Sequence, residues 1–261
     1  MPESDLALLA RAARSAGEVA LRFHGPSAKR WDKPGGAGPV TEADIAVNAA
    51  LADILRTARP DYGWLSEEDP DTPDRLSAES CFVLDPIDGT TGFIEGSSSW
   101  SLSIAVTTRG AVAAAVVYLP AHDLLYSAEA GGGAQLNGAR LAASARQDIA
   151  GADVLATRYA LDAKNWPHGR PDFKRHHRPS LAYRLALVGE GRFDAMLTLR
   201  ESWDWDIAAG LLICTEAGAL VTDRHGRAPR FNTDPPRTAG VVAAPPQLHA
   251  PLLAALGGAA A

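Results

Sequence analysis

The chain has 261 residues, a length suited to one large domain or two small ones. Hydrophobic residues make up 46% of it and charged residues 21%, a balance that excludes disordered, collagen-like and coiled-coil proteins. The net charge of −6 argues against binding of a nucleic-acid polymer through bulk positive charge. Two cysteines, Cys81 and Cys214, exclude a disulfide scaffold and a cysteine zinc cluster, and they suit the reducing cytoplasm.

Two amphipathic helices are predicted in the first 60 residues. Apolar residues recur at helical spacing over residues 4–24. Residues 33–39 contain three glycines and two prolines and predict a loop. The second helix is expected to begin near Thr41 and to end at Pro60, and Thr41 and Asp44 have the spacing of a capping box.

Strand patterns begin near residue 80. Strands are predicted over residues 81–84, 102–107, 111–118 and 124–128. After residue 150 strands are predicted over 154–157, 193–199 and 240–243, and helices over 180–189, 206–217 and the C-terminal residues. We therefore expect an N-terminal α+β half over residues 1–150 and a C-terminal α/β half over residues 151–261. The longest uncharged apolar run, residues 111–119, is about half the length that spans a membrane, so no membrane association is expected.

Charge is distributed unevenly along the chain. Residues 61–74 hold six acids and no Lys or Arg, whereas residues 158–184 hold seven bases, two acids and three histidines. One interpretation is two solvated faces. The other is a cation site in the acidic segment and an anion-binding surface in the basic one.

Four carboxylates are candidates for a metal site. Asp85 and Asp88 follow the predicted strand 81–84 in the string Asp85-Pro-Ile-Asp-Gly-Thr90, at the strand end that faces the usual ligand crevice of a sheet. The other two are Glu67 and Asp206. Oxygen ligands without a neighbouring His or Cys suit Mg²⁺, and carboxylates so close together repel unless a cation separates them. Taken alone, Asp-Gly is also an ordinary turn sequence.

The string from Asp85 to Thr90 resembles the signature of the inositol monophosphatase superfamily, the lithium-sensitive Mg²⁺-dependent phosphomonoesterases. Further segments are similar to its other motifs and occur in the same order, at residues 39–44, 65–68, 205–210 and 215–218. Together they cover most of the chain between residues 33 and 218. The resemblance implies a layered αβαβα sandwich with the site between its two halves.

The resemblance also implies two Mg²⁺ ions, or three if Asp44 supports an additional weaker ion. The first ion would be held by Glu67, Asp85 and the carbonyl of Ile87, and the second by Asp85, Asp88 and Asp206. Phosphate-ester hydrolysis needs an acidified water and a positive clamp for developing charge, and two nearby metals supply both.

Several residues would position the water and the phosphate. Glu67 and Thr90 would position the attacking water, with Asp44 supporting Thr90. The backbone N–H groups of Gly89 and Thr90 would cradle the phosphate, beside Asp88. Lys33 lies at the family's spacing for a loop lysine near the phosphate.

Each assignment has a structural alternative. Thr41 and Asp44 could only cap a helix, and Asp206 could cap the helix that follows it. Glu68 and Lys33 could be surface residues. Trp203 and Trp205 are expected to be packing residues.

The substrate is predicted from weaker signals. Inositol monophosphatases carry a glutamate seven residues before the Asp206 position, and this chain has Leu199 there, with Glu201 as the nearest carboxylate. Residues 59–68, 92–96 and 180–185 resemble the CysQ-like branch of 3′(2′),5′-bisphosphate nucleotidases. In that interpretation Arg178, Ser180 and Arg184 would bind substrate, and residues 174–178 could contact a second phosphate or an adenine. The alternatives are a solvated loop and, for Arg184, a helix surface.

The predicted function is therefore Mg²⁺-dependent hydrolysis of 3′-phosphoadenosine 5′-phosphate to AMP and phosphate by a metal-activated water. The alternative is hydrolysis of inositol-1-phosphate or of another small sugar, alcohol or histidinol phosphate. A third hypothesis is a non-catalytic relative that binds a nucleotide. The expected partner is a small phosphorylated substrate, with neither nucleic-acid polymer nor membrane, and many relatives are homodimers.

Overall fold

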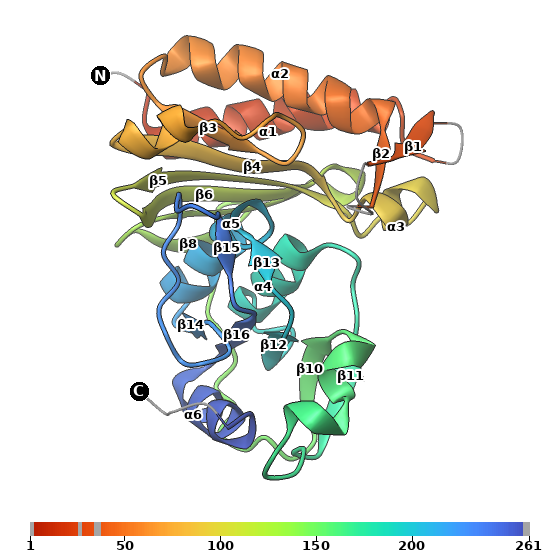
Figure 1. The fold of residues 1–261 in the computed structure, drawn as a ribbon, viewed down its shortest axis with the longest axis vertical. Coiled ribbons are helices and arrows are strands. Elements are labelled where there is room, and N and C mark those ends of the chain that lie inside the picture. The colour runs from red at the N-terminus through yellow and green to blue at the C-terminus, as the bar shows by residue number, and fades with distance from the viewer. Residues whose placement is uncertain (1–2, 26–27, 34–37, 258–261) are drawn as a thin grey trace.

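The computed structural model describes residues 3–25, 28–33 and 38–257. Figure 1 shows alternating layers of helices and sheets, stacked along the long axis of the molecule. Two helices cover a seven-stranded sheet, two helices lie between that sheet and a five-stranded one, and a last helix covers the second sheet. Three separate apolar clusters fill the spaces between these layers. The predicted layered αβαβα sandwich is confirmed.

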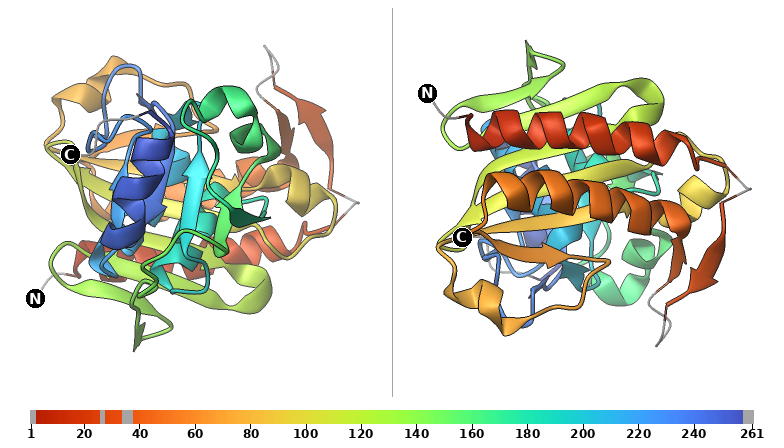
Figure 2. Two further views of the ribbon diagram at one scale, coloured as in Figure 1. Left: turned by 90° about the horizontal axis from the view of Figure 1, so that it is seen from below. Right: turned by 90° about the horizontal axis from the view of Figure 1, so that it is seen from above.

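Helices α1 (Asp5–Leu21) and α2 (Glu42–Ala58) lie side by side on the outer face of the first sheet (Figure 2). Both begin with a capping side chain, since Ser4 caps α1 and Thr41 forms a capping box with Asp44 at α2. The predicted second helix and its capping box are confirmed. The predicted loop over residues 33–39 falls in part on residues 34–37, outside the described residues. On its two sides, β1 (Arg30–Asp32) and β2 (Pro39–Thr41) pair antiparallel.

The first sheet has the order β3-β4-β5-β6-β7-β8-β9. Its strands are β3 (Gly63–Ser66), β4 (Ser80–Asp88), β5 (Ser101–Thr108), β6 (Ala111–Leu119), β7 (Leu124–Glu129), β8 (Gly133–Leu136) and β9 (Ala139–Arg140). Neighbours are antiparallel except β3 and β4, which are parallel. The four strands predicted before residue 150 are confirmed, but β4 extends to Asp88, with a register shift between Asp85 and Asp88. A short helix, α3 (Thr90–Ile94), follows directly.

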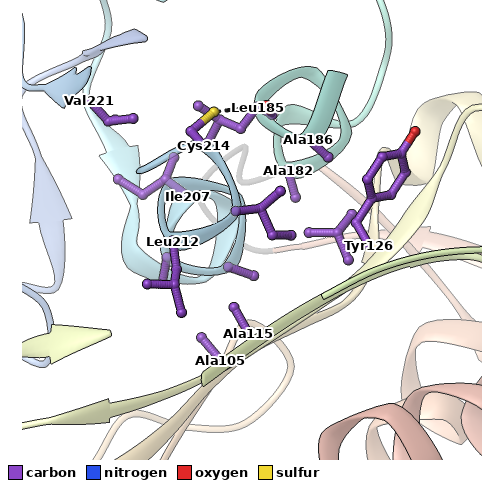
Figure 3. Packing of buried hydrophobic residues seen from close by; sticks show 14 of the residues in the cluster. Ala105, Ala115, Tyr126, Ala182, Leu185, Ala186, Ile207, Leu212, Cys214 and Val221 are labelled. Carbon is purple, nitrogen blue, oxygen red and sulfur yellow. Dashed lines mark hydrogen bonds between the residues drawn. The ribbon is translucent and has the colours of Figure 1, made fainter. Parts of the chain in front are cut away.

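Helices α4 (Leu181–Gly189) and α5 (Asp204–Glu216) form the middle layer and are buried on both sides. Figure 3 shows their side chains meeting the first sheet at Ala105 and Ala115, whose small side chains allow a close approach. Gly210 of α5 is needed where the two helices touch. A Cβ at this position would lie 2.5 Å from the Cβ of Leu185.

The second sheet has the order β11-β10-β12-β16-β14. Its strands are β10 (Ala152–Ala156), β11 (Phe173–His176), β12 (Ala195–Thr198), β14 (Leu220–Thr222) and β16 (Val241–Ala244). A separate pair is formed by β13 (Ser202–Trp203) and β15 (Arg237–Thr238). Helix α6 (Pro246–Ala255) covers the outer face of the second sheet (Figures 1 and 2). The prediction missed two strands of this sheet: β11, in which basic residues obscure the apolar pattern, and β14, which is only three residues long.

The two sheets lie on either side of residue 150 in the sequence, and the apolar cluster around α4 and α5 contacts both. The division into two domains at that residue stays a prediction. Within the described residues, no helix is both long enough and apolar enough to cross a membrane.

Candidate active site

Three carboxylates from both halves of the sequence meet at one point. Asp85 and Asp88 lie at the end of β4, and Asp206 lies in the first turn of α5. One carboxylate oxygen from each lies within 4.8 Å of the others. The N-cap of α5 is Trp203, so Asp206 does not occupy the N-cap position, although a hydrogen bond from the Trp203 backbone lowers the pKa of its carboxyl group.

The electrostatics of this cluster suit a divalent cation. Burial raises the pKa of Asp85 and of Asp206 well above the ordinary value, and repulsion from the other carboxylates raises it further. Among the described residues, no lysine or arginine forms an ion pair with any of the three carboxylates. Two buried carboxylates and one half-buried one, without a cation in ion-pair contact in the described part of the chain, form a donor set that fits Mg²⁺.

Asp88 is held by the start of helix α4. Its oxygens accept hydrogen bonds from Ser180 Oγ at 2.7 Å, from the backbone N–H of Leu181 at 3.1 Å and from that of Ala182 at 2.6 Å. Burial raises the pKa of Asp88, and these three donors act in the opposite direction. Ser180 is fully buried, and its hydroxyl also forms a hydrogen bond with that of Ser101. The side chain of Ser180 therefore contacts other protein groups and is not open to the cleft.

Thr90 and Asp44 form a second polar group beside the cluster. Thr90 Oγ1 lies 3.0 Å from the carbonyl oxygen of Ile87 and 3.4 Å from Asp44 Oδ1. The other oxygen of Asp44 accepts from the backbone N–H and the hydroxyl of Thr41. Asp44 therefore caps the helix and contacts Thr90 at once, and burial raises its pKa. The capping interpretation is confirmed and is compatible with the functional role, which stays a prediction.

Lys33 closes the other side of the site. Its Nζ lies 2.7 Å from Glu67 Oε1 and 2.7 Å from Glu68 Oε1. Its side chain is only 16% exposed and that of Glu68 only 4%, so the surface alternative is wrong for both. Burial raises the pKa of Glu68 to about 7 although Lys33 lowers it. Burial alone would lower the pKa of Lys33, but the effect of the two carboxylates is larger, so the pKa of Lys33 is raised.

A cleft of about 440 Å³ opens beside these groups. It is lined by Gly38, Pro39, Glu67, Gly89, Thr90, Thr91, Gly92, Glu95, His177 and Pro179. Gly89 has φ +97°, and a Cβ there would lie 3.0 Å from the backbone nitrogen of Ser180, so only glycine fits. Partial burial and three nearby arginines lower the pKa of His177. The sequence marked His177 only as part of the basic segment.

The predicted substrate-binding arginines have other partners here. The guanidinium of Arg184 is buried and donates to the carbonyl oxygens of Arg178 at 2.6 Å and Pro179 at 2.9 Å. The helix-surface alternative for Arg184 is therefore wrong. Arg178 donates to the carbonyl of His177, and its guanidinium lies over the Phe193 ring. His176 lies 2.7 Å from Asp153, on the neighbouring strand.

Comparison with known proteins agrees with this arrangement. The model of the inositol monophosphatase family matches residues 1–259. The Nus factor SuhB of Escherichia coli K12 is 35% identical over 233 residues, which is 85% of each chain. The inositol-1-monophosphatase of Rhizobium meliloti is 37% identical over 202 residues, which is 74% of each chain.

Two solved structures extend the likeness to the fold. The extragenic suppressor protein suhB of Bartonella henselae superposes with a TM-score of 0.81 at 28% identity, over 95% of this chain and 96% of that one. The inositol monophosphatase (IMPase) of Thermotoga maritima superposes with a TM-score of 0.82 at 28% identity, over 95% and 94% of the two chains. The chain belongs to the inositol monophosphatase family and is an Mg²⁺-dependent phosphoric monoester hydrolase.

Proposed function

We propose that the protein is a 3′(2′),5′-bisphosphate nucleotidase that hydrolyses 3′-phosphoadenosine 5′-phosphate to AMP and phosphate. The observation that carries this choice is the environment of Leu199, where inositol monophosphatases have a glutamate for ring hydroxyls. Leu199 is 3% exposed in an apolar cluster, and Thr198 before it is 8% exposed. The chain thus offers no carboxylate at that place, while several arginines lie near the site.

The metal ligands would be those that the family resemblance implies. Glu67, Asp85 and the Ile87 carbonyl would hold one Mg²⁺, and Asp85, Asp88 and Asp206 a second. Bound Mg²⁺ acidifies a water and offsets the charge of the phosphoryl oxygens. The hydrogen bonds of Asp88 to α4 would keep its carboxylate in place without reorganisation.

The chain's own groups would orient the attacking water. The hydroxyl of Thr90 donates its proton to the Ile87 carbonyl or to Asp44. The lone pairs of Thr90 Oγ1 are then free to accept a hydrogen bond from a water in the cleft. Glu67 lines the same cleft and would accept the second proton. Lys33 would exchange one of its two carboxylate contacts for a phosphoryl oxygen.

Ser180 and Arg184 would act on substrate indirectly in this scheme. Ser180 holds Asp88, and Arg184 holds the backbone of Arg178 and Pro179, of which Pro179 lines the cleft. The N–H groups of Gly89 and Thr90 would face the phosphate. Arg178 remains a candidate for contact with the substrate.

The second candidate is hydrolysis of inositol-1-phosphate, because the relative from Rhizobium meliloti carries that activity in its name. Glu201 is the carboxylate that would replace the missing glutamate, and its side chain is 68% exposed. Glu201 lies 3.4 Å from Arg237, which would have to release it. Glu201 also lies five residues before Asp206 instead of seven, so it would need a different register, and this is why we place the inositol substrate second.

We expect a small phosphorylated substrate as the partner and the cytoplasm as the compartment, since Cys81 and Cys214 are buried as free thiols. A homodimer is a further expectation from the family.

Phosphate release with and without Mg²⁺ and Li⁺ tests the proposal. The substrates would be 3′-phosphoadenosine 5′-phosphate, inositol-1-phosphate, histidinol phosphate and fructose-1,6-bisphosphate. We expect Mg²⁺-dependent, Li⁺-inhibited release with a preference for the nucleotide. A preference for inositol-1-phosphate would overturn the proposal in favour of the second candidate, and release from none of the four would overturn both.

A further inference from the structure

A second pocket lies at the start of α5, the helix whose first turn carries Asp206. It measures about 380 Å³ and is lined by Arg200, Glu201, Ser202, Trp203 and Arg237. The short pair of β13 and β15 forms it, because Trp203 and Arg237 are register partners. This size lies within the range of small-molecule sites.

Both guanidinium groups in this pocket rest on aromatic rings. Arg237 Cζ lies 3.8 Å from the centroid of the Trp203 ring, and Arg200 Cζ lies 4.5 Å from that of Tyr159. The Trp203 ring in turn stacks on Trp205 at 4.6 Å and 12°. Stacking limits the rotation of a guanidinium and leaves its in-plane N–H donors free for an anion.

The pocket wall and a predicted metal ligand belong to the same helix start. Trp203 is the N-cap of α5, and Asp206 follows three residues later. At about 1.5 Å per residue the two backbone positions lie roughly one helical turn apart. Ser103 Oγ donates to the Trp205 carbonyl at 2.7 Å and ties this turn to the first sheet. A ligand held at the cluster could therefore reach the pocket with its leaving group.

The charge of the pocket favours an anion. Glu201 Oε2 lies 3.4 Å from Arg237, but the side chain of Glu201 is 68% exposed and that of Arg237 40%, so the pair is weak. Among the described residues, Arg200 has no carboxylate partner within ion-pair distance. Two guanidinium groups against one loosely held carboxylate leave a net positive site.

We propose that Arg200 and Arg237 bind the second phosphate of a bisphosphate substrate, the group that is not hydrolysed. The inference rests on the proposed function and adds to it the residues that would separate a bisphosphate from a monophosphate. The anion displaces Glu201 from Arg237 and takes up the free donors of both guanidinium groups.

The test compares two substrates that share the scissile group. Adenosine 3′,5′-bisphosphate and adenosine 3′-monophosphate differ only in the 5′-phosphate. The wild-type protein should prefer the bisphosphate in kcat/KM. Arg200→Gln and Arg237→Gln should each reduce that preference about tenfold, as expected for one charge-assisted hydrogen bond to phosphate. The loss should appear in KM for the bisphosphate, with the monophosphate unchanged within about twofold.

Arg170→Gln is the matched control. The guanidinium of Arg170 also lies over an aromatic ring, at 5.4 Å from Phe173, but Arg170 does not line the pocket. It should leave the preference unchanged. Glu201→Gln should change KM in the direction opposite to the arginine variants. It should lower KM for the bisphosphate about twofold, because it removes the competing carboxylate.

The outcomes separate the two proposals. Hydrolysis of the bisphosphate with unchanged preference in both arginine variants would overturn the subsite and leave the proposed function in place. An equal loss on both substrates would also overturn it, because the arginines would then support the fold or the chemistry. If wild type hydrolyses neither adenosine phosphate, the proposed function fails and the subsite with it.

Discussion

The carboxylate cluster and the basic segment are both marked by charge in the sequence, yet the fold treats them differently. Asp85, Asp88 and Asp206 come from distant parts of the chain and meet within 4.8 Å. The bases of residues 174–184 are neighbours in sequence, and the fold disperses them. Arg184 turns inward to backbone carbonyls, while Arg178 stays on the surface over Phe193.

The difference follows from burial. A buried carboxylate needs a donor or a cation, so its position is set by the elements around it, as Asp88 is by the N–H groups of α4. An exposed base is satisfied by water in many positions, so its sequence clustering does not define a common target. Charge patterns are therefore more informative about function where the residues are buried.

The largest expected effect is at the cluster. Asp206→Asn keeps the shape of the side chain but removes one anionic ligand, so Mg²⁺-dependent phosphate release should fall about a hundredfold or more. Circular dichroism of the Mg²⁺-free variant checks that the fold is kept. If the variant turned over substrate as fast as the wild type at saturating Mg²⁺, Asp206 would lie outside the metal site.

Stability should depend on Mg²⁺ and on pH in a linked way. The pKa values of Asp85 and Asp206 lie well above their ordinary 3.8 because of burial and mutual repulsion. Without Mg²⁺ the folded chain retains protons that the unfolded chain has lost, so this contribution to stability is present at low pH and is lost as pH rises through the raised values. Thermal unfolding of the Mg²⁺-free protein should therefore shift to lower Tm as pH rises above about 4.

Mg²⁺ should oppose that loss. At a hundred times its Kd it stabilises the folded state by about 2.7 kcal/mol, which corresponds to roughly 5 to 10 °C in Tm. The measurement is a Tm series with EDTA or Mg²⁺ at each pH, with Asp206→Asn as the comparison. Equal Tm values in EDTA and Mg²⁺ at neutral pH would contradict the metal site.

The cluster also depends on helix packing. Gly210→Ala would place a Cβ 2.5 Å from Leu185 Cβ and 3.1 Å from the carbonyl oxygen of Ala182, which forces α4 and α5 apart. We expect a loss of about 1–3 kcal/mol in unfolding free energy, measured by urea denaturation. Gly96→Ala is a comparison site without close neighbours, although its positive φ adds strain of its own. Unchanged stability of Gly210→Ala would show that the helices can separate freely.

The smallest effect is expected in the basic segment. Arg178→Ala removes an exposed guanidinium that bonds only the neighbouring His177 carbonyl among its hydrogen-bond partners in the described residues. This variant should raise KM for the bisphosphate about threefold, and it should raise KM for the monophosphate less than that. The effect on the bisphosphate should be smaller than that of Arg200→Gln. Equal effects on both substrates would place residues 174–178 outside the substrate site.

Local patterns in the sequence predicted much of the first half of the site. The capping box at Thr41, the strand before Asp85 and the turn at Gly89 all depend on neighbours within a few residues, so their spacing is informative. Strand β11 and the short β3 were missed, because bases hide the apolar period in one and the other is only four residues long.

By itself the sequence determined which carboxylates are present, that they suit Mg²⁺, and the helix and strand periods that carry them. The family resemblance also led us to expect Asp206 beside Asp85 and Asp88, and the structure brings them together. Only the tertiary structure decided that Lys33 pairs with Glu67 and Glu68, and that Arg237 covers Trp203. Local periods report on short stretches of backbone. The distance between residues far apart in the chain is set by strand register and by the close packing of α4 and α5, which no short stretch contains.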